Sequence, residues 1–366
     1  MSDNQHYITK AYLDRFVHST SGQRVLYPYS RAQGIRKAKG TKRLGCADSF
    51  FLQKDGSEVN NKVDEARKTI ESQVFASGKA TAGPLAKCIF DDSYLPNTQE
   101  IGELILAAAF LWWSSPVQIQ NSAMITLLSY QADLFNRMNT EKAKAYYQEQ
   151  YGDQATAQLK ADREAVLNGE LFVDVGEENW RQLGFSSPSD MAIVGEQLAR
   201  MEFALCHSHR NSFFLTSDNP VLFLSSAQPN NPGLELPDTR VWFPISHNRG
   251  LLWSHRKKNP LGSIRLERRN LGFSETRTLN RHIVKWCYKD VYSPLPESWV
   301  EEAVKSAEFD PCFGHYGSLK QLIEAHTAPA VFHGPNGKQR NGEIVNMTAG
   351  LRTGEKCDAV RIGRPG

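Results

Sequence analysis

Polar residues in two separate parts of the chain have side chains suited to acid–base or metal chemistry. Ser217, Asp218 and Asn219 lie between two apolar runs in "FFLTSDNPVLFL", and His6 lies near the N-terminus. A carboxylate at a strand end can act as a general base or bind a divalent metal, and an imidazole titrates near neutral pH. These residues predict a phosphodiester hydrolase in which His6, Asp218 and Asn219 are catalytic and Asp218 is the ligand of any divalent metal.

The same residues also support a structural interpretation. Asp218 can accept backbone N–H bonds as an Asx turn, and Pro220 restricts Asn219 to extended geometry. The alternative is therefore a non-catalytic recognition or interaction module in which both segments serve the fold. The hydrolase requires the two segments to line one cleft, whereas the alternative requires His6 and Asp218 to be buried and fully hydrogen-bonded.

Two basic clusters could hold the phosphates of a nucleic acid or a nucleotide. Residues 31–43 contain six basic side chains and no acid, and "HRKKNPLGSIRLERR" occupies 255–269. Positive charge gives affinity for phosphate whatever the base sequence. The expected substrate-binding residues are Gln5, Tyr7, Ser217, Arg36, Lys37, Arg256 and Lys257. Three aromatic residues near the clusters could stack on bases if they are exposed, namely Tyr27, Tyr29 and Trp253.

The overall charge leaves the question of a polyanionic partner open. The formal net charge is +3 on 366 residues, which is too small to require such a partner. Basic runs in a chain of this kind are usually solvated surfaces balanced by acids elsewhere. Nucleic acid is therefore one expected partner, and two solvated faces are the alternative.

Several common catalytic classes are disfavoured because their motifs are missing. The chain has no G-x-S-x-G, G-x-G-x-x-G or H-E-x-x-H pattern, and "FHGPNGKQ" at 332–339 lacks the Ser or Thr of a phosphate loop. His207 and His209 have no further ligands at zinc-site spacing. The segment 206–210 is instead interpreted as a polar helix end whose positive charge suits the helix dipole.

The pattern of apolar residues predicts an α+β fold in which a helical middle region packs on a mainly antiparallel sheet. Helices are expected at 5–18, 63–74, 101–139, 141–168, from 188 through the apolar stripe that ends at Leu205, and from about Ser274. Strands are expected at 22–31, 213–216, 221–225, 241–245 and 250–254. Gly34 and Gly40 argue against a helix in the first basic cluster, which is expected to be an exposed loop.

The expected organisation is a single α+β domain over 4–295, with its helical region at about 60–210. A C-terminal helical extension is expected at 296–330. Glycine and polar residues without periodicity predict a flexible tail at 331–366.

Two stretches together resemble a known family. "NQHYITKAYLDRF" at 4–16, and "FFLTSDNPV" followed by "VWFPIS", resemble a bacterial and fungal family of unknown function with a His-Tyr-Ile-Pro motif and a later Thr-Ser-Asp-Asn-Pro motif. The resemblance covers roughly 4–295 and implies a common fold and a shared polar site, with no assigned reaction. Thr9 stands where that motif has proline. Ser114 and Ser115 stand where the family tends to carry an arginine, so a phosphate-binding role for that arginine is not carried over.

Cysteine usage and hydropathy bear on the compartment. Six scattered cysteines without a C-x-x-C pair predict reduced thiols and a cytoplasmic protein. The most apolar run, "LILAAAFLWW" at 104–113, is about half the ~20 residues that cross a bilayer. It is expected to be a buried helix, and no membrane partner is expected.

Overall fold

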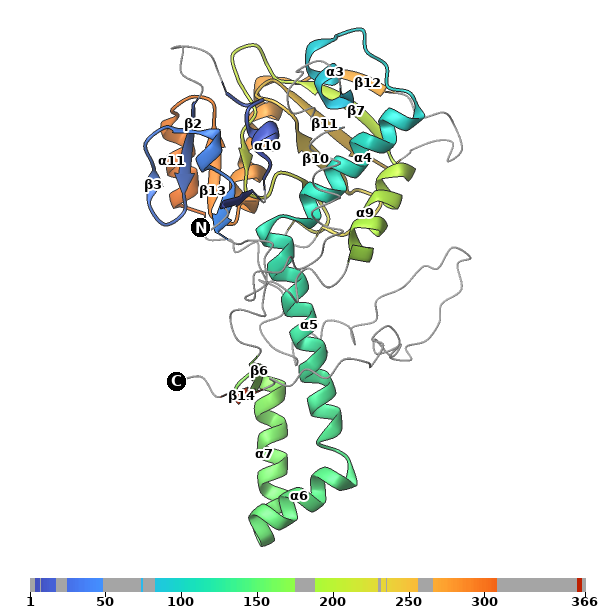
Figure 1. Cartoon of the computed structure of the whole chain (residues 1–366), viewed down its shortest axis with the longest axis vertical. Helices are drawn as coiled ribbons and strands as arrows, with labels where there is room; N and C mark the ends of the chain where they lie inside the picture. The colour runs from blue at the N-terminus through green and yellow to red at the C-terminus, as the bar shows by residue number, and fades with distance from the viewer. Residues whose placement is uncertain are drawn as a thin grey trace. The chain divides into compact units, whose positions relative to one another are not determined.

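The computed structural model describes residues 4–6, 8–17, 25–48, 74, 83–174, 188–229, 232–234, 236–255, 266–307 and 361–363. The chain folds as two compact units (Figure 1). The first comprises Met1–Ile119 with Phe185–Cys312, and the second comprises Gln120–Gly184 with Phe313–Gly366. Helices and mostly antiparallel strands confirm the α+β class.

The larger sheet of the first unit has five strands in the order β12-β7-β11-β10-β9. Their bounds are β7 Glu202–His207, β9 Leu222–Leu224, β10 Arg240–Pro244, β11 Arg249–Ser254 and β12 Leu266–Asn270. Neighbouring strands are antiparallel except for β12, which runs parallel to β7. The predicted strands at 221–225, 241–245 and 250–254 are confirmed as β9, β10 and β11.

Successive side chains along each strand point to opposite faces of this sheet, and both faces are buried in a core cluster. On one face, Leu205, Phe243 and Leu251 belong to the first core cluster. On the other face, Cys206 and Trp242 belong to the second cluster. Strands covered on both sides read as continuous apolar runs, as these do in the sequence.

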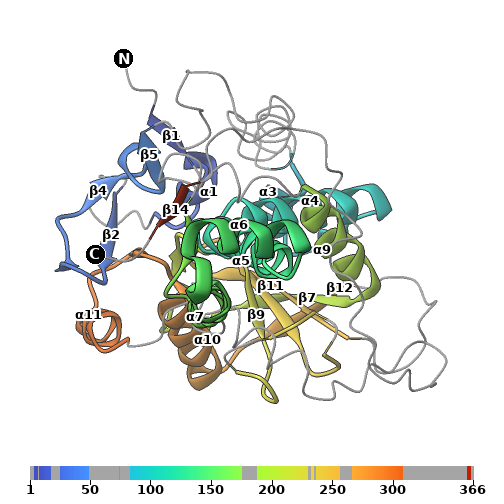
Figure 2. The same ribbon diagram turned by 90° about the horizontal axis from the view of Figure 1, so that it is seen from below.

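Helices cover the two faces of the sheet. The helices of the first unit include α3 Pro84–Phe90, α4 Thr98–Trp113, α9 Pro188–Arg200, α10 Phe273–Trp286 and α11 Ser298–Lys305. Side chains of α4 and α9 join the first cluster, and Figure 2 shows these two helices side by side with α3. Side chains of α10 and α11 join the second cluster. Asn97 and Glu100 form a capping box that fixes the start of α4.

A second sheet of the first unit has the order β3-β2-β13-β8, with β4 also paired to β2. The bounds are β2 Val25–Ser30, β3 Gly34–Ile35, β4 Lys39–Gly40, β8 Thr216–Ser217 and β13 Asp290–Ser293. The N-terminal segment contributes β1 Asn4–His6, which pairs with β5 Cys46–Asp48, and helix α1 Lys10–Leu13. A 3₁₀ turn, η1 Thr41–Arg43, lies between β4 and β5.

The second unit contains mostly helices with exposed surfaces. Helix α5 Pro116–Arg137 begins in the first unit and continues into this one, and the elements that follow are α6 Glu141–Tyr151, η3 Gly152–Gln154, α7 Ala155–Asn168 and β6 Phe172–Asp174. Strand β6 pairs with β14 Arg361–Gly363. Helix α6 has no buried residue, as expected for the charged segment 141–168. Gly169, with φ of 77°, ends α7 in the left-handed conformation that glycine adopts without strain.

The structure corrects several local predictions. The first basic cluster, expected to be an exposed loop, contains β3, β4 and η1, and of the strand expected at 213–216 only Thr216 lies in a strand. The helix expected at 5–18 is strand β1 followed by the short helix α1, because Thr9 caps a helix that begins only at Lys10. The helix that begins at 188 ends at Arg200, and Leu205 lies in strand β7. The segment 206–210 continues from β7 and is not a helix end. The helix expected at 63–74 lies almost wholly outside the described residues, and the predicted tail does so except for β14.

Candidate functional site

The Asp218 carboxylate is completely buried and binds three successive backbone N–H groups. Its Oδ1 accepts from Tyr288 N at 2.8 Å, and its Oδ2 accepts from Lys289 N at 2.6 Å and Asp290 N at 2.9 Å. The Asp218 N–H in turn donates to the Asp290 carbonyl at 3.1 Å. These four bonds join the end of β8 to the segment between α10 and β13.

Burial and these bonds have opposite effects on the acidity of Asp218. Removal of the carboxylate from water raises its pKa, and the three N–H donors lower it. The first effect is larger, so the pKa rises from 3.8 to about 6. The group is therefore ionised at neutral pH and takes up a proton in mildly acidic solution.

Asn219 and Ser217 complete this turn. Asn219 Nδ2 donates to the Trp286 carbonyl at 2.9 Å, close to the C-terminal end of α10. The Ser217 hydroxyl donates to the Asn219 carbonyl at 2.9 Å and accepts from the Asn219 N–H at 3.1 Å. All three polar residues of the turn are buried and bonded to backbone groups. We call Ser217, Asp218 and Asn219 together the buried turn.

A tyrosine connects the N-terminal segment to the strand that precedes the buried turn. The Tyr12 hydroxyl lies 2.8 Å from Thr216 Oγ1 and donates to the Pro244 carbonyl at 2.6 Å. Tyr12 is fully buried, and burial raises the pKa of its hydroxyl far above the usual value. The hydroxyl is therefore a permanent neutral donor that joins α1 to β8 and β10.

The other N-terminal candidates are placed less completely. Gln5 and His6 lie in β1, where their backbones pair with Ala47 and Cys46. Tyr7 lies outside the described residues. Among the described residues, the Tyr12 hydroxyl links the N-terminal segment to Thr216, which directly precedes the buried turn. A His6–Asp218 site stays a prediction.

Two of the six basic residues in the first cluster have structural partners. Arg31 donates from Nη2 to the carbonyls of Lys285 at 2.6 Å and Val284 at 3.4 Å, near the C-terminal end of α10. Arg36 forms a salt bridge with Asp290 at 2.5 Å. Both arginines thus hold the same segment that the buried turn binds. Lys37 is exposed.

The remaining basic residues of the first cluster help to form a pocket. It has a volume of about 530 Å³, and we call it the basic pocket. Its polar lining residues are Lys10, Asp14, Lys39, Thr41, Lys42 and Arg43. Asp14 is the acidic member, and it is bonded to Lys10 at 2.5 Å and to the Thr41 hydroxyl at 2.5 Å. Lys42 and Arg43 are exposed.

The structure gives little support for a nucleic-acid contact by the second basic cluster or by the aromatic candidates. Arg256 and Lys257 lie outside the described residues. Tyr29 and Trp253 are buried at 0% and 1% exposure, so neither can stack on a base. Tyr27 is partly buried and packs on the second core cluster.

Within the described ranges, no group of three or more His, Cys, Asp or Glu side chains is placed to hold a metal ion. His207 ends β7, and His209 packs edge-on against Phe273. The cysteines of this part of the chain are free thiols, namely Cys46, Cys88, Cys206 and Cys287. None of its helices combines the length and apolar character of a membrane span.

Sequence reasoning missed Lys10 and Asp14 as pocket residues. Both lie in or next to helix α1, a short way after the His-Tyr segment, and the contact of α1 with η1 brings them to the basic residues near position 40. Arg249 was also missed, although it begins β11 immediately after a polar hairpin turn.

Comparison with known proteins places most of the chain in one family. Residues 4–294 match the family described as "Protein of unknown function (DUF4238)". No curated protein and no solved structure matches the chain.

Proposed function

The chain belongs to the DUF4238 family of proteins of unknown function, and we propose that it is a non-catalytic recognition module that binds nucleic acid through the basic pocket. The observation that carries this proposal is the composition of the pocket. Four basic side chains and one acidic side chain line a volume of about 530 Å³.

The state of the charges in the pocket favours an anionic ligand. Asp14 is bonded to Lys10 and Thr41. In the part of the chain that the structure describes, Lys39, Lys42 and Arg43 form no salt bridge. Three nearby cations without carboxylate partners repel one another, and phosphate groups relieve this repulsion. Phosphate contacts of this kind bind many base sequences alike.

The buried turn supports the non-catalytic part of the proposal. Each Asp218 oxygen already accepts a backbone N–H, and Asn219 donates to a backbone carbonyl. A general base must reach the proton that it removes from the substrate, and a fully buried carboxylate is poorly placed to do so.

The test is the salt dependence of binding to a fluorescein-labelled single-stranded oligonucleotide, measured by fluorescence anisotropy. Each phosphate contact contributes about −0.7 to the slope of log K against log salt, so four contacts give a slope of about −3. The double variant Lys42→Ala/Arg43→Ala should bind at least tenfold more weakly and lower the magnitude of the slope by about 1.4.

The matched control is Lys142→Ala/Lys160→Ala, which removes the same charge from exposed positions of α6 and α7. Its affinity should equal that of the wild type. Absence of binding by the wild type at about 50 mM salt, or equal losses in the two double variants, would overturn the proposal.

The second candidate is the phosphodiester hydrolase with His6, Asp218 and Asn219 as catalytic residues. The observation in its favour is that the pKa of Asp218 rises to about 6, because a carboxyl that titrates close to neutrality suits acid–base catalysis. Substrate contacts from Gln5, Tyr7, Ser217, Arg36, Lys37, Arg256 and Lys257, and a divalent metal on Asp218, belong to this candidate.

A cleavage assay with Mg²⁺ or Mn²⁺ on the same labelled oligonucleotide distinguishes the recognition module from the hydrolase. The recognition module leaves the strand intact. Cleavage by the wild type that disappears in a folded Asp218→Asn variant would instead establish the hydrolase.

A further inference from the structure

One histidine and two arginine side chains lie at one end of the larger sheet, on the face that α3 and α4 cover. They are His207, Arg249 and Arg268. Arg249 of β11 pairs directly with His207 of β7, and Arg268 of β12 pairs with Leu205. Paired residues and residues two apart on a strand point to the same side. His207, Arg249 and Arg268 therefore share the face of Leu205, and together with Asp92 we call them the arginine site.

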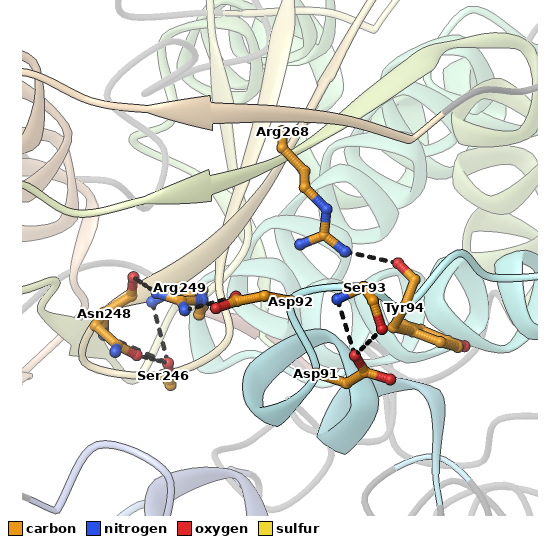
Figure 3. A network of polar contacts seen from close by, with 8 residues as sticks. All are labelled: Asp91, Asp92, Ser93, Tyr94, Ser246, Asn248, Arg249 and Arg268. Carbon is orange, nitrogen blue, oxygen red and sulfur yellow. Dashed lines mark hydrogen bonds and ion pairs between the residues drawn. The ribbon is translucent and has the colours of Figure 1, made fainter.

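The loop after α3 lies against the side chains of Arg249 and Arg268 (Figure 3). Arg268 donates from Nη2 to the Tyr94 carbonyl at 2.7 Å. Arg249 donates from Nη2 to Asp92 Oδ1 at 3.1 Å. Figure 3 shows both guanidinium groups directed toward the loop from β11 and β12, the two strands on either side of β7, with the Asp92 carboxylate beside Arg249.

Three nitrogen atoms of the arginine site are enclosed without a hydrogen-bond partner. They are Arg249 Nε, Arg268 Nη1 and His207 Nε2. Buried polar atoms are nearly always paired, and the guanidinium group forms strong, often bidentate hydrogen bonds with carboxylate and phosphate oxygen atoms. Three unpaired nitrogen atoms in one place therefore indicate an absent acceptor with several oxygen atoms.

The acid that meets Arg249 is weakly held. The Asp92 side chain is 76% exposed, whereas that of Arg249 is 15% exposed. A carboxylate that keeps most of its contact with water loses little when it swings away. Burial first, and then the charges of Arg249 and Arg268, lower the pKa of His207, so its ring is neutral near pH 7.

We propose that the arginine site binds a phosphate group of a ligand, and that this phosphate displaces the Asp92 carboxylate from Arg249. Arg249 and Arg268 supply charged donors from two strands, and neutral His207 supplies a further ring nitrogen. The inference does not depend on the basic pocket, because the two sites share no residue.

The first experiment is isothermal titration of the full chain with three probes: inorganic phosphate, adenosine monophosphate and a single-stranded oligonucleotide. Binding of either small probe would support a site for free phosphate or a nucleotide. Binding of the oligonucleotide alone, with a loss in Arg268→Gln, would support a site for the backbone phosphate of a nucleic acid.

Two variants have opposite expected effects. Asp92→Asn removes the competing charge from an exposed position, so it should fold normally and bind the effective probe severalfold more tightly. Arg268→Gln removes one charged donor and should weaken binding at least tenfold. Asp153→Asn changes the same charge on an exposed residue of the second unit and should have no effect.

The alternative is that Asp92 and Arg249 only hold the loop on the sheet. In that case Asp92→Asn lowers the melting temperature and leaves the affinity for every probe unchanged. That result, or failure of both the wild type and Asp92→Asn to bind any probe, would overturn the proposal. Lys42→Ala/Arg43→Ala should keep full affinity for inorganic phosphate, which separates this site from the basic pocket.

Discussion

Replacement of Tyr12 by phenylalanine tests whether the N-terminal segment and the strand before the buried turn are locked together. The substitution removes a hydroxyl that lies 2.8 Å from Thr216 Oγ1 and donates to the Pro244 carbonyl at 2.6 Å. The ring itself stays in the core, where it stacks on Phe243. The change therefore removes these two buried hydrogen bonds and keeps the aromatic ring.

The expected loss follows from the groups left behind. Thr216 is fully buried, so its hydroxyl loses a partner in a place that water does not reach. Loss of one partner from a buried hydrogen bond costs about 1–3 kcal/mol. Because one of the two groups is a hydroxyl that can rotate, we expect Tyr12→Phe to lower the free energy of unfolding by about 2–3 kcal/mol.

Urea denaturation followed by tryptophan fluorescence measures this loss, and a double-mutant cycle with Thr216→Val isolates the contact. The coupling energy between the two positions should be about 1 kcal/mol or more. A Tyr12→Phe variant as stable as the wild type, or two losses that simply add, would refute the conclusion that this contact joins α1 to β8.

Two further changes test the core and the buried turn. Gly250→Ala should lower the free energy of unfolding by about 3 kcal/mol, because the added Cβ would overlap the Trp242 ring, whereas Gly102→Ala on an open face of α4 should raise it by about 1 kcal/mol. Equal effects in chemical denaturation would contradict this packing. Because the folded-state pKa of Asp218 is raised from 3.8 to about 6, its contribution to stability is full below about pH 4 and is lost as the pH rises through 6, by about 3 kcal/mol. Asp218→Asn should lack this loss, so a stability difference between the two proteins that is the same at pH 4 and pH 7 would count against the raised pKa.

Local patterns were enough to predict several elements of the fold. Helix α10 has an apolar stripe at helical spacing, and strands β10 and β11 are apolar runs separated by turn residues. The sequence predicts a helix where the structure has strand β7, because Met201 and Leu205 continue the helical spacing of α9. A short apolar run does not distinguish a helix from a strand. The parallel pairing of β12 with β7 joins segments about 60 residues apart, and no local signal specifies it.

The candidate site was predictable only in part, for a related reason. The residue types of the buried turn show that Asp218 can accept backbone N–H groups. They do not show that the donors are Tyr288, Lys289 and Asp290, which follow about 70 residues later. The partners of a polar side chain depend on tertiary packing, and they decide whether the same carboxylate is a reactive group or part of the scaffold.

The segment 284–290 shows which basic residues of the first cluster hold the fold together and which are left to bind a ligand. Residues 284–290 form hydrogen bonds with the side chains of the buried turn. Arg31 donates to backbone carbonyls at the end of α10, and Arg36 forms a salt bridge with Asp290. Carbonyl groups already accept from Arg31 and a carboxylate already pairs with Arg36, so these two arginines have fewer N–H groups left for a ligand. Lys39, Lys42 and Arg43 of the first basic cluster form no salt bridge among the described residues, and they line the basic pocket. The basic pocket is the expected ligand site because these three basic residues lack such partners. The number of basic residues along the sequence does not by itself identify the site.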